Sequence, residues 1–409
     1  MMVKFQPPRG TRDYLPVEMA LRRELFGKLR RVFEGFGYGE VSTPAFEDFE
    51  LLAKKAGQEI EKELYAFTDK SGRKLALRFD PTVPICRIIA SNPGLPKPIK
   101  WYYITNMWRY DRPQKGRFRE FWQAGAELVG AAGAEADAEI LEIVSECLKA
   151  AGVKSFRFRM GSREVLEKLV GQAGIPTGKK LAAFRALDKL PKIGEAGVAR
   201  EFAREGIGKA QGQKFLGLVR KGVRDERLES ILGLLKGRGI KNAKLDLSVV
   251  RGIDYYTGFV FETLVEGFES LGSVASGGRY DTLIGLYGGE PLPATGFGIG
   301  IERLAEMVRK HPSPPCQLLV VNAGELFRGK SREVARQLRE GGISCETDLM
   351  GRSLRKQLEY ANARGIPWAL FVGEKEVRSG SYTLRDMVSG KEAALALERV
   401  KKKLVQERR

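Results

Sequence analysis

Residues 108–123 read WRYDRPQKGRFREFWQ, the densest polar string in the chain. Five cations surround a turn that contains Pro113 and Gly116, and aromatic residues stand on both sides of the turn. The flanking segments, 101–110 and 118–129, have the composition of strands. The stretch is therefore predicted to join two antiparallel strands.

On such a pair of strands, Arg109 and Arg117 can converge on one anion while Phe121 offers a flat stacking surface. Guanidinium groups bind phosphate oxygens in a bidentate fashion, and an aromatic face suits adenine, so the pattern indicates a nucleotide site. The alternative is a cationic hairpin that only faces solvent, and composition alone supports both interpretations equally.

The surrounding segments predict a sheet covered by helices. An amphipathic helix is expected over 17–36, a strand over 73–79, and a second helix over 134–151 that ends at Gly152. The Val41–Pro44 segment should be extended, because proline disfavours helix in the residue before it. This order favours an α+β domain built on an antiparallel sheet.

Residues 167–244 change in character, being rich in Lys and Gly and mostly helical in pattern, and we interpret them as an insertion. Strands are then expected at 245–250 and 258–265, followed by a glycine cluster at 272–300 and a helix at 301–310. The main domain would therefore comprise residues 1–166 and 245–312.

A Pro-rich linker at 311–315 precedes a second, α/β domain at 316–409. Its expected strands and helices alternate along the chain. The strands are at 317–322, 343–347, 368–372 and 380–386, and the helices at 330–341, 353–364 and 391–405.

Composition narrows the possible functions. No apolar run approaches the ~18 residues of a membrane span, and residues 1–8 lack the apolar core of a signal peptide, so we expect a cytoplasmic protein without membrane attachment. The four cysteines are too widely spaced for a C-x-x-C metal or redox pair. His311 is the single histidine, so a zinc site with several histidine ligands is excluded. A Ser-His-Asp triad would have to use His311, which lies in the predicted linker.

The net charge of +19 is concentrated in two segments. Residues 167–244 carry a net +10 and residues 315–409 a net +7, whereas the rest of the chain is nearly neutral. Contact with a polyanion at several separated places would explain this distribution. The alternative is a surface rich in Lys, Arg and Glu of the kind found in thermophiles.

Three further strings carry polar groups between glycines. Residues 251–258 (RGIDYYTG) place an arginine, a carboxylate and two tyrosines close together, although tyrosines are also ordinary strand residues. Residues 275–281 read ASGGRYD. Residues 294–304 (ATGFGIGIERL) combine a Gly-rich strand, on which a ligand can lie, with Arg303 in the following helix, although such a strand also suits tight sheet packing.

Taken together in this order, the strings resemble a known family. Residues 109–123 are similar to motif 2 of the class II aminoacyl-tRNA synthetases, 296–304 to motif 3, and 37–44 to the degenerate motif 1. The 251–258 string closely resembles a signature of the histidyl-tRNA synthetases. Segments 8–13, 276–281 and 348–358 also fit that family, so the resemblance covers essentially the whole chain.

The resemblance implies roles for individual residues. Arg109 and Arg251 would act on the ATP α-phosphate as catalytic groups, Phe121 would stack on adenine, and Arg117 and Arg303 would hold the outer phosphates. Histidine-binding residues would be Asp80, Thr82, Gln123, Glu127, Arg251, Tyr255 and Tyr256. Asp80 departs from family members that carry Glu there, and Asp111 stands where class II enzymes often have Glu.

The family implies ATP-dependent formation of histidyl-adenylate and transfer of histidine to the 3′ end of tRNA(His), with release of AMP and diphosphate. Mg²⁺ would arrive with ATP rather than in a cage of protein ligands alone, and the substrate carboxylate, already a nucleophile, needs no general base. The domains would be a class II catalytic domain (1–166 and 245–312), a helical insertion (167–244) and an anticodon-binding domain (316–409). Motif 1 implies a homodimer.

Two other functions stay open at this stage. One is a non-catalytic paralogue that serves as a regulatory subunit in histidine biosynthesis, but such relatives tend to lose the tRNA domain and the arginine set. The other is a synthetase for glycine, threonine or proline, against which the 251–258 string argues.

Residues 324–331 (GELFRGKS) satisfy the Walker A pattern and follow an apolar strand. Glu325 would bring negative charge to a phosphate cradle, and Leu326 and Phe327 are bulky for such a loop. We therefore interpret the string as the first strand-to-helix turn of the second domain.

Overall fold

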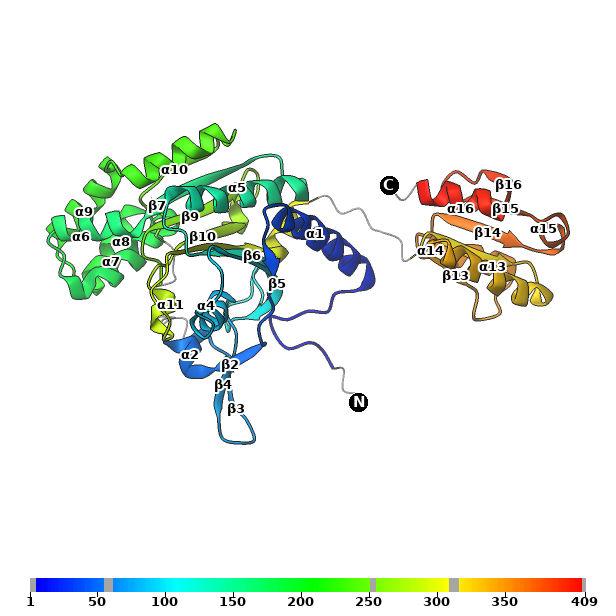
Figure 1. The fold of residues 1–409 in the computed structure, drawn as a ribbon, viewed down its shortest axis with the longest axis horizontal. Helices are drawn as coiled ribbons and strands as arrows, with labels where there is room; N and C mark the ends of the chain where they lie inside the picture. The colour runs from blue at the N-terminus through cyan, green and yellow to red at the C-terminus, as the bar shows by residue number, and fades with distance from the viewer. Residues whose placement is uncertain (1–4, 55–61, 251–254, 309–315, 407–409) are drawn as a thin grey trace. The chain divides into compact units, whose positions relative to one another are not determined.

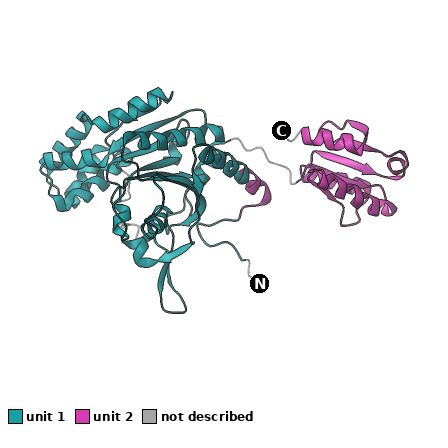
Figure 2. Cartoon of the chain, viewed as in Figure 1, with its two compact units in different colours: residues 1–13, 22–309 teal, residues 14–21, 310–409 magenta. Residues whose placement is uncertain are grey.

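The computed structural model describes residues 5–54, 62–250, 255–308 and 316–406. The chain divides into two compact units, residues 1–13 with 22–309 and residues 14–21 with 310–409 (Figure 2). Each unit has its own sheet and its own apolar core.

An eight-stranded sheet forms the centre of the first unit, in the order β1-β5-β6-β11-β10-β9-β7-β8 (Figure 1). The five inner pairings are antiparallel, which confirms the predicted sheet, while β1 with β5 and β7 with β8 are parallel pairs at the two edges. The strands are β1 (Gly39–Glu40), β5 (Ile99–Trp108), β6 (Glu120–Val129), β7 (Phe156–Ser162), β8 (Ala243–Leu245), β9 (Phe259–Val265), β10 (Ala275–Arg279) and β11 (Ala294–Gly300).

Alternation along β6 gives the sheet two different faces. Ala124, Ala126 and Leu128 join the main apolar cluster, which includes residues of α1 (Pro16–Gly35) and α5 (Ala134–Ala151). The intervening residues point to the opposite face, because successive side chains of a strand alternate. That opposite face carries α4 (Thr82–Ala90) and α11 (Leu283–Leu286), and its polar side chains build the candidate site.

The covering helices form for local reasons that the sequence displays. In α1, Leu25, Leu29 and Phe33 recur at helical spacing and are buried. Gly152 ends α5 with a φ of 93°, a left-handed conformation that favours glycine. The remaining short elements of this unit are α2 (Phe49–Ala53), α12 (Ile301–Met307), η2 (Glu269–Leu271) and a small sheet of β2 (Phe46–Asp48), β4 (Lys74–Leu77) and β3 (Ala66–Thr68).

The basic segment is helical, as expected. It comprises the end of α6 (Arg163–Gln172), η1 (Thr177–Lys179), α7 (Lys180–Asp188), α8 (Leu190–Arg204), α9 (Lys209–Lys221) and α10 (Glu226–Gly237). Its apolar residues, such as Phe184 and Phe215, belong to the same cluster as those of α5. A separate inserted domain at 167–244 stays a prediction.

The prediction of a strand at 245–250 is wrong. The strand there is β8, which ends at Leu245, and Asp246 then accepts hydrogen bonds from the amide and the hydroxyl of Ser248 at 3.1 Å and 2.6 Å. This local side-chain bonding turns the chain away from the sheet. The helix expected at 301–310 ends at Met307.

The second unit has a five-stranded sheet in the order β13-β12-β14-β15-β16, in which β12 runs parallel to β13 and β14. Its elements are β12 (Leu318–Asn322), η3 (Glu325–Phe327), α13 (Arg328–Glu340), β13 (Cys345–Thr347), α14 (Leu354–Ala363), β14 (Trp368–Val372), α15 (Glu374–Ser379), β15 (Ser381–Asp386), β16 (Glu392–Ala396) and α16 (Leu397–Gln406). The four expected strands are confirmed.

The prediction of a helix over 391–405 is wrong for the first residues of that range. Residues Glu392–Ala396 form β16 and pair antiparallel with β15. Glu, Ala and Leu favour helix intrinsically, but strand pairing overrides propensity over such a short run. No helix in the described parts of the chain is both long enough and apolar enough to cross a bilayer.

Candidate active site

A cavity of about 840 Å³ lies over the polar face of the large sheet. Ten of the eleven residues predicted from the sequence line this one cavity, although they come from segments spread over more than 200 positions. They are Asp80, Thr82, Arg109, Arg117, Phe121, Gln123, Glu127, Tyr255, Tyr256 and Arg303. The eleventh, Arg251, lies outside the described residues.

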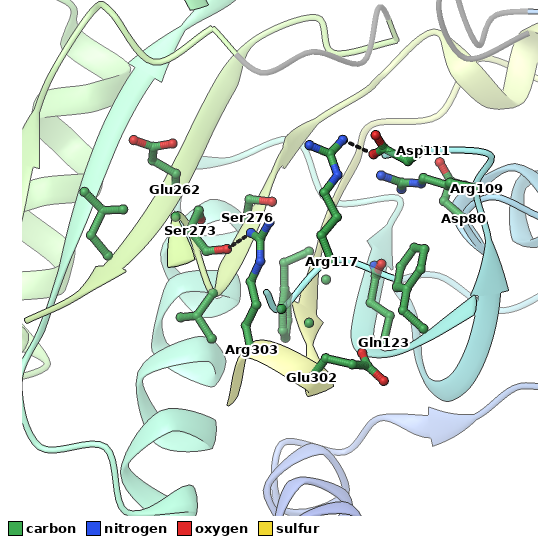
Figure 3. A pocket seen from close by; sticks show the side chains of 18 of the residues that line it. Asp80, Arg109, Asp111, Arg117, Gln123, Glu262, Ser273, Ser276, Glu302 and Arg303 are labelled. Atoms are coloured by element: carbon green, nitrogen blue, oxygen red, sulfur yellow. Dashed lines mark hydrogen bonds and ion pairs between the residues drawn. The ribbon is translucent and has the colours of Figure 1, made fainter. Parts of the chain in front are cut away.

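Arginines gather at one part of the cavity. Arg109 donates from Nε to the carbonyl oxygen of Phe79 at 3.0 Å, and its guanidinium lies 5.3 Å from the centre of the Phe121 ring. Arg117 forms an ion pair with Asp111. Figure 3 shows the side chains of Arg117 and Arg303 extending in the same direction, with Arg303 bonded to the Ser273 carbonyl oxygen. Three cations thus line the cavity, and Arg109 lies beside an aromatic ring.

A buried ion pair supports the helix that carries Arg303. Glu302 accepts a hydrogen bond from Arg22 at 2.9 Å, and its two carboxylate oxygens share the single N–H of the Trp122 amide, each at 3.1 Å from the nitrogen. The side chains of Arg22 and Glu302 are only 3% and 5% exposed. These contacts tie α1 and β6 to the start of α12, the helix that carries Arg303.

Two buried carboxyl groups mark another part of the cavity. Glu127 accepts hydrogen bonds from the hydroxyls of Thr82, at 2.7 Å, and Tyr280. Asp80 accepts from the Val83 amide at 3.2 Å and from the Tyr255 hydroxyl at 3.5 Å. This part of the cavity therefore offers hydrogen-bonding oxygens enclosed by phenol rings.

Burial raises the pKa values of the acidic groups in this part of the cavity. Removal from water raises the pKa of Glu127 to about 8, although the hydroxyls of Tyr280 and Thr82 oppose the shift. Burial also raises the pKa of Asp80, and the positive charge of Arg109 counteracts this. The phenols of Tyr103, Tyr255 and Tyr280 have raised pKa values because they are buried, so they remain hydrogen-bond donors.

Glycines in β11 make room for the polar side chains of β6. A Cβ added at Gly296 would overlap the Glu127 carboxylate, and one added at Gly298 would overlap the Gln123 amide. The Gly-rich pattern therefore serves the site, because a side chain at either position would displace a lining group.

Some lining residues were missed from the sequence. Tyr103 accepts a hydrogen bond from Gln123 Nε2 at 3.0 Å, and Tyr280 bonds Glu127. Tyr280 lies within the 275–281 string and Tyr103 within a predicted strand, but nothing local distinguishes a lining tyrosine from a packing one. Arg159, paired with Glu262 and with Asp246, also lines the cavity.

The Walker A-like string does not form a phosphate cradle. Residues 324–327 form the turn between β12 and α13, as expected, and residues 328–331 begin α13. Lys330 lies 3.0 Å from both carboxylate oxygens of Glu333. Ser331 is 2% exposed, so its hydroxyl is not available to a nucleotide-bound metal.

Comparison with known proteins agrees with this geometry. The family model described as "Histidyl-tRNA synthetase" matches residues 10–304, and the model "Anticodon binding domain" matches 317–407. The chain belongs to the histidyl-tRNA synthetase family. It is accordingly a class II aminoacyl-tRNA synthetase by fold, as the sequence motifs predicted.

Relatives along the full length support the assignment to this family. Proteins named histidine–tRNA ligase from Thermococcus kodakarensis and Aeropyrum pernix are each 40% identical, over 97% and 96% of this chain and 98% and 96% of theirs. The crystal structure of histidyl-tRNA synthetase from Nostoc sp. PCC 7120 is 29% identical with a TM-score of 0.84, covering 99% of this chain and all of that one. The S. aureus enzyme, at 23% identity and TM-score 0.72, shows the same fold over 98% of this chain and all of its own.

Proposed function

We propose that the chain activates L-histidine with ATP to form histidyl-adenylate and transfers histidine to the 3′ end of tRNA(His), releasing AMP and diphosphate. The single observation that supports this most strongly is the shared cavity. It brings a cluster of arginines and an aromatic ring next to buried carboxyl and phenol groups. One substrate is anionic and aromatic, and the other is a small polar ring, so the two kinds of lining match the two substrates.

The part of the cavity that is lined by arginines suits ATP. Arg109, held by the Phe79 carbonyl, would contact the α-phosphate, while Arg117 and Arg303 would hold the outer phosphates. Phe121 would stack on adenine. Negative charge grows on the α-phosphate oxygens in the transition state, so fixed guanidinium groups there lower the barrier. Arg251 is proposed for the same role on the resemblance alone.

The part of the cavity that is lined by Asp80 and Glu127 suits histidine. The carboxyl of Glu127, held by Thr82 and Tyr280, would accept a hydrogen bond from the imidazole. Asp80 would accept one from the substrate ammonium. Tyr255, Tyr256, Thr82 and Gln123 would complete the pocket. A site of buried hydrogen-bonding groups rejects analogues that leave those groups unpaired.

Magnesium is proposed to bind with ATP. Mg²⁺ retains several waters and is usually held by one or two carboxylates together with substrate phosphates. Asp111, next to Arg117, and Glu269 are carboxylates of the cavity wall that would assist the phosphates in holding it. When bound, the ion would neutralise charge on the phosphates during displacement.

The proposal extends to partners and location. The second unit would contact the tRNA anticodon, because its family model is an anticodon-binding domain. Motif 1 resemblance implies a homodimer. The cytoplasm is the expected location, since charging of tRNA takes place where the tRNA is.

Histidine-dependent exchange of pyrophosphate into ATP tests the proposal. Exchange with L-histidine, but not with glycine, threonine or proline, is the expected result. Exchange with another amino acid would overturn the specificity, and no exchange with any amino acid would favour the regulatory paralogue. Arg251→Ala should reduce exchange by orders of magnitude and leave tRNA binding nearly unchanged.

A further inference from the structure

A second buried ion pair joins α5 to the end of β10, on the face of the large sheet that α5 covers. The side chains of Asp137 in α5 and Arg279 in β10 are 0% and 2% exposed. Arg279 donates to the Asp137 carboxylate from Nε at 3.1 Å and from Nη2 at 2.9 Å. Such a forked contact fixes the plane of the guanidinium as well as its position. Among the described residues, neither Asp137 nor Arg279 lines the cavity.

A second arginine, from the basic helical segment, holds the same carboxylate. Arg227 lies in α10, which packs beside α5 (Figure 1). It donates from Nε to Asp137 at 2.9 Å and from Nη2 to the carbonyl oxygen of Ala132 at 2.6 Å. Arg279 donates to the carbonyl oxygen of the preceding residue, Ala131, at 3.2 Å. Two guanidinium groups from different segments therefore hold one buried carboxylate and the loop that follows β6.

The backbone of Arg279 connects this pair to the wall of the cavity. Its carbonyl oxygen accepts hydrogen bonds from the Thr257 amide at 2.8 Å and from the Thr257 hydroxyl at 3.4 Å. The same hydroxyl accepts a hydrogen bond from the Asp281 amide at 3.1 Å. Thr257 is thus held by the residues on both sides of Tyr280, and it directly follows Tyr256, which lines the cavity.

Tyr280 is the next residue after Arg279 and faces the cavity. Successive side chains of an extended chain point to opposite faces. Arg279 accordingly contacts α5, while the Tyr280 hydroxyl donates to Glu127. The Tyr280 and Tyr255 rings also contact each other, with their centres 5.7 Å apart. A shift of the main chain at Arg279 would therefore displace two of the phenols that line the cavity.

We propose that Arg279, clamped by Asp137, is a positioning residue for the tyrosines and the carboxyl group that bind histidine. A buried ion pair adds little net stability over apolar side chains of the same volume, because both charges lose their hydration. What this pair supplies is a fixed geometry, since binding groups act well only when they are held within about 0.5 Å of the productive arrangement. The inference rests on the proposed function for the identity of the ligand.

The first test removes the outer cation of the network and leaves the buried pair in place. Arg227 has a side chain that is 36% exposed, so Arg227→Met should fold. Its Kd for L-histidine in isothermal titration calorimetry should rise about threefold, because Asp137 loses one of the two cations that hold it. The KM for ATP in pyrophosphate exchange should stay within about twofold of the unaltered value.

The matched control is Arg238→Met. Arg238 also joins α10 to α5, through ion pairs with Glu135 and Glu142, and its side chain is 25% exposed. The carboxylate that Arg279 binds is a different one, that of Asp137. The control should therefore bind histidine as the unaltered protein does. Equal losses of histidine affinity in Arg227→Met and Arg238→Met would trace the effect to the packing of α10 in general and would overturn the proposal.

The second test changes the buried pair itself. Arg279→Lys keeps the charge but loses the fork, so it should raise the Kd for histidine at least about tenfold, again with little change in the KM for ATP. Residues that act through one contact are not additive. In the background of Tyr280→Phe, the same change should therefore cost clearly less than it does alone. Losses that multiply would show that Arg279 acts independently of Tyr280 and would overturn the proposal.

The two readouts separate this proposal from the proposed function. Calorimetry measures histidine binding without ATP or tRNA, so it tests the positioning role even if the chain lacks exchange. Absence of exchange in the unaltered protein, with histidine affinity lost in the variants, would overturn the proposed function alone. Exchange in the unaltered protein, with histidine affinity unchanged in Arg279→Lys and Arg227→Met, would overturn the positioning role alone. An unaltered protein that does not bind histidine would overturn both.

Discussion

Gly296 and Glu127 stand directly opposite each other in the β11–β6 pair, and the Glu127 carboxylate occupies the space that a side chain at position 296 would fill. Glu127 is 1% exposed, and its carboxyl group receives two hydroxyl hydrogen bonds in that position. The orientation of one group that lines the cavity therefore depends on the absence of a single methyl group in the neighbouring strand.

Gly296→Ala should reduce kcat/KM for histidine in pyrophosphate exchange by about a hundredfold, the cost of displacing a binding group by roughly 1 Å. Gly300→Ala in the same strand is the control, because the nearest atoms to a Cβ there are 3.9 Å away. Similar losses in both variants would show that the strand, rather than Glu127, is sensitive to substitution.

Glu127 should also make stability depend on pH. Its folded-state pKa of about 8 exceeds the ordinary 4.5, so the folded protein binds this proton more readily than the unfolded chain. Its contribution to stability is fully present below about pH 4.5 and is lost as the pH rises to about 8. Relative to Glu127→Gln, the unaltered protein should therefore lose stability over this range in urea titrations. Parallel profiles for the two proteins would contradict the raised pKa.

The Arg22–Glu302 pair should contribute strongly to stability. Arg22→Met leaves the Glu302 carboxylate buried without its cation, and removal of one partner of a buried pair typically costs about 3–5 kcal/mol. Lys168→Ala, which breaks a pair whose side chains are 65% and 63% exposed, should change the free energy of unfolding by less than about 0.5 kcal/mol. Equal losses of stability in the two variants would show that burial does not determine how much an ion pair contributes to stability.

Removal of the second unit should separate the two steps of the reaction. A chain that ends at Pro315 retains the cavity and the complete main core, because the second unit has apolar clusters of its own. Histidine activation should persist, while the KM for tRNA in aminoacylation should rise about tenfold or more as the cationic segment is lost. An unchanged KM with its usual salt sensitivity would argue against tRNA contact by this unit.

Lys330 should be dispensable for nucleotide chemistry. Its ammonium pairs with Glu333 in the next turn of α13, so Lys330→Ala should leave exchange within about twofold of the unaltered rate. Loss of ATP-dependent activation would instead identify the 324–331 loop as a nucleotide site.

The two strands of motif 2 could be predicted because the residues that determine them are neighbours in the sequence. The strands expected at 101–110 and 118–129 appear as β5 and β6 with shifts of two residues or fewer, and the alternation that sets Gln123 and Glu127 on the polar face is visible in the sequence. Ten of the residues that the motifs indicated line one cavity, whereas their roles stay predictions.

The parts that escaped prediction depend on distant partners. Tyr280 becomes a site residue only because its hydroxyl meets Glu127, 153 positions earlier in the chain. Residues 392–396 become a strand only because β15 offers an edge, against their own preference for helix. Neither fact is present in the local pattern.

All four cysteines are buried, and burial raises the pKa of each thiol. Thiolates are the form that reacts with maleimides, so the native chain should label slowly. A cysteine introduced at an exposed position such as Leu349 would then be the preferred target for a fluorophore. The unaltered protein thus provides an unreactive background on which a dye can be attached at one chosen position.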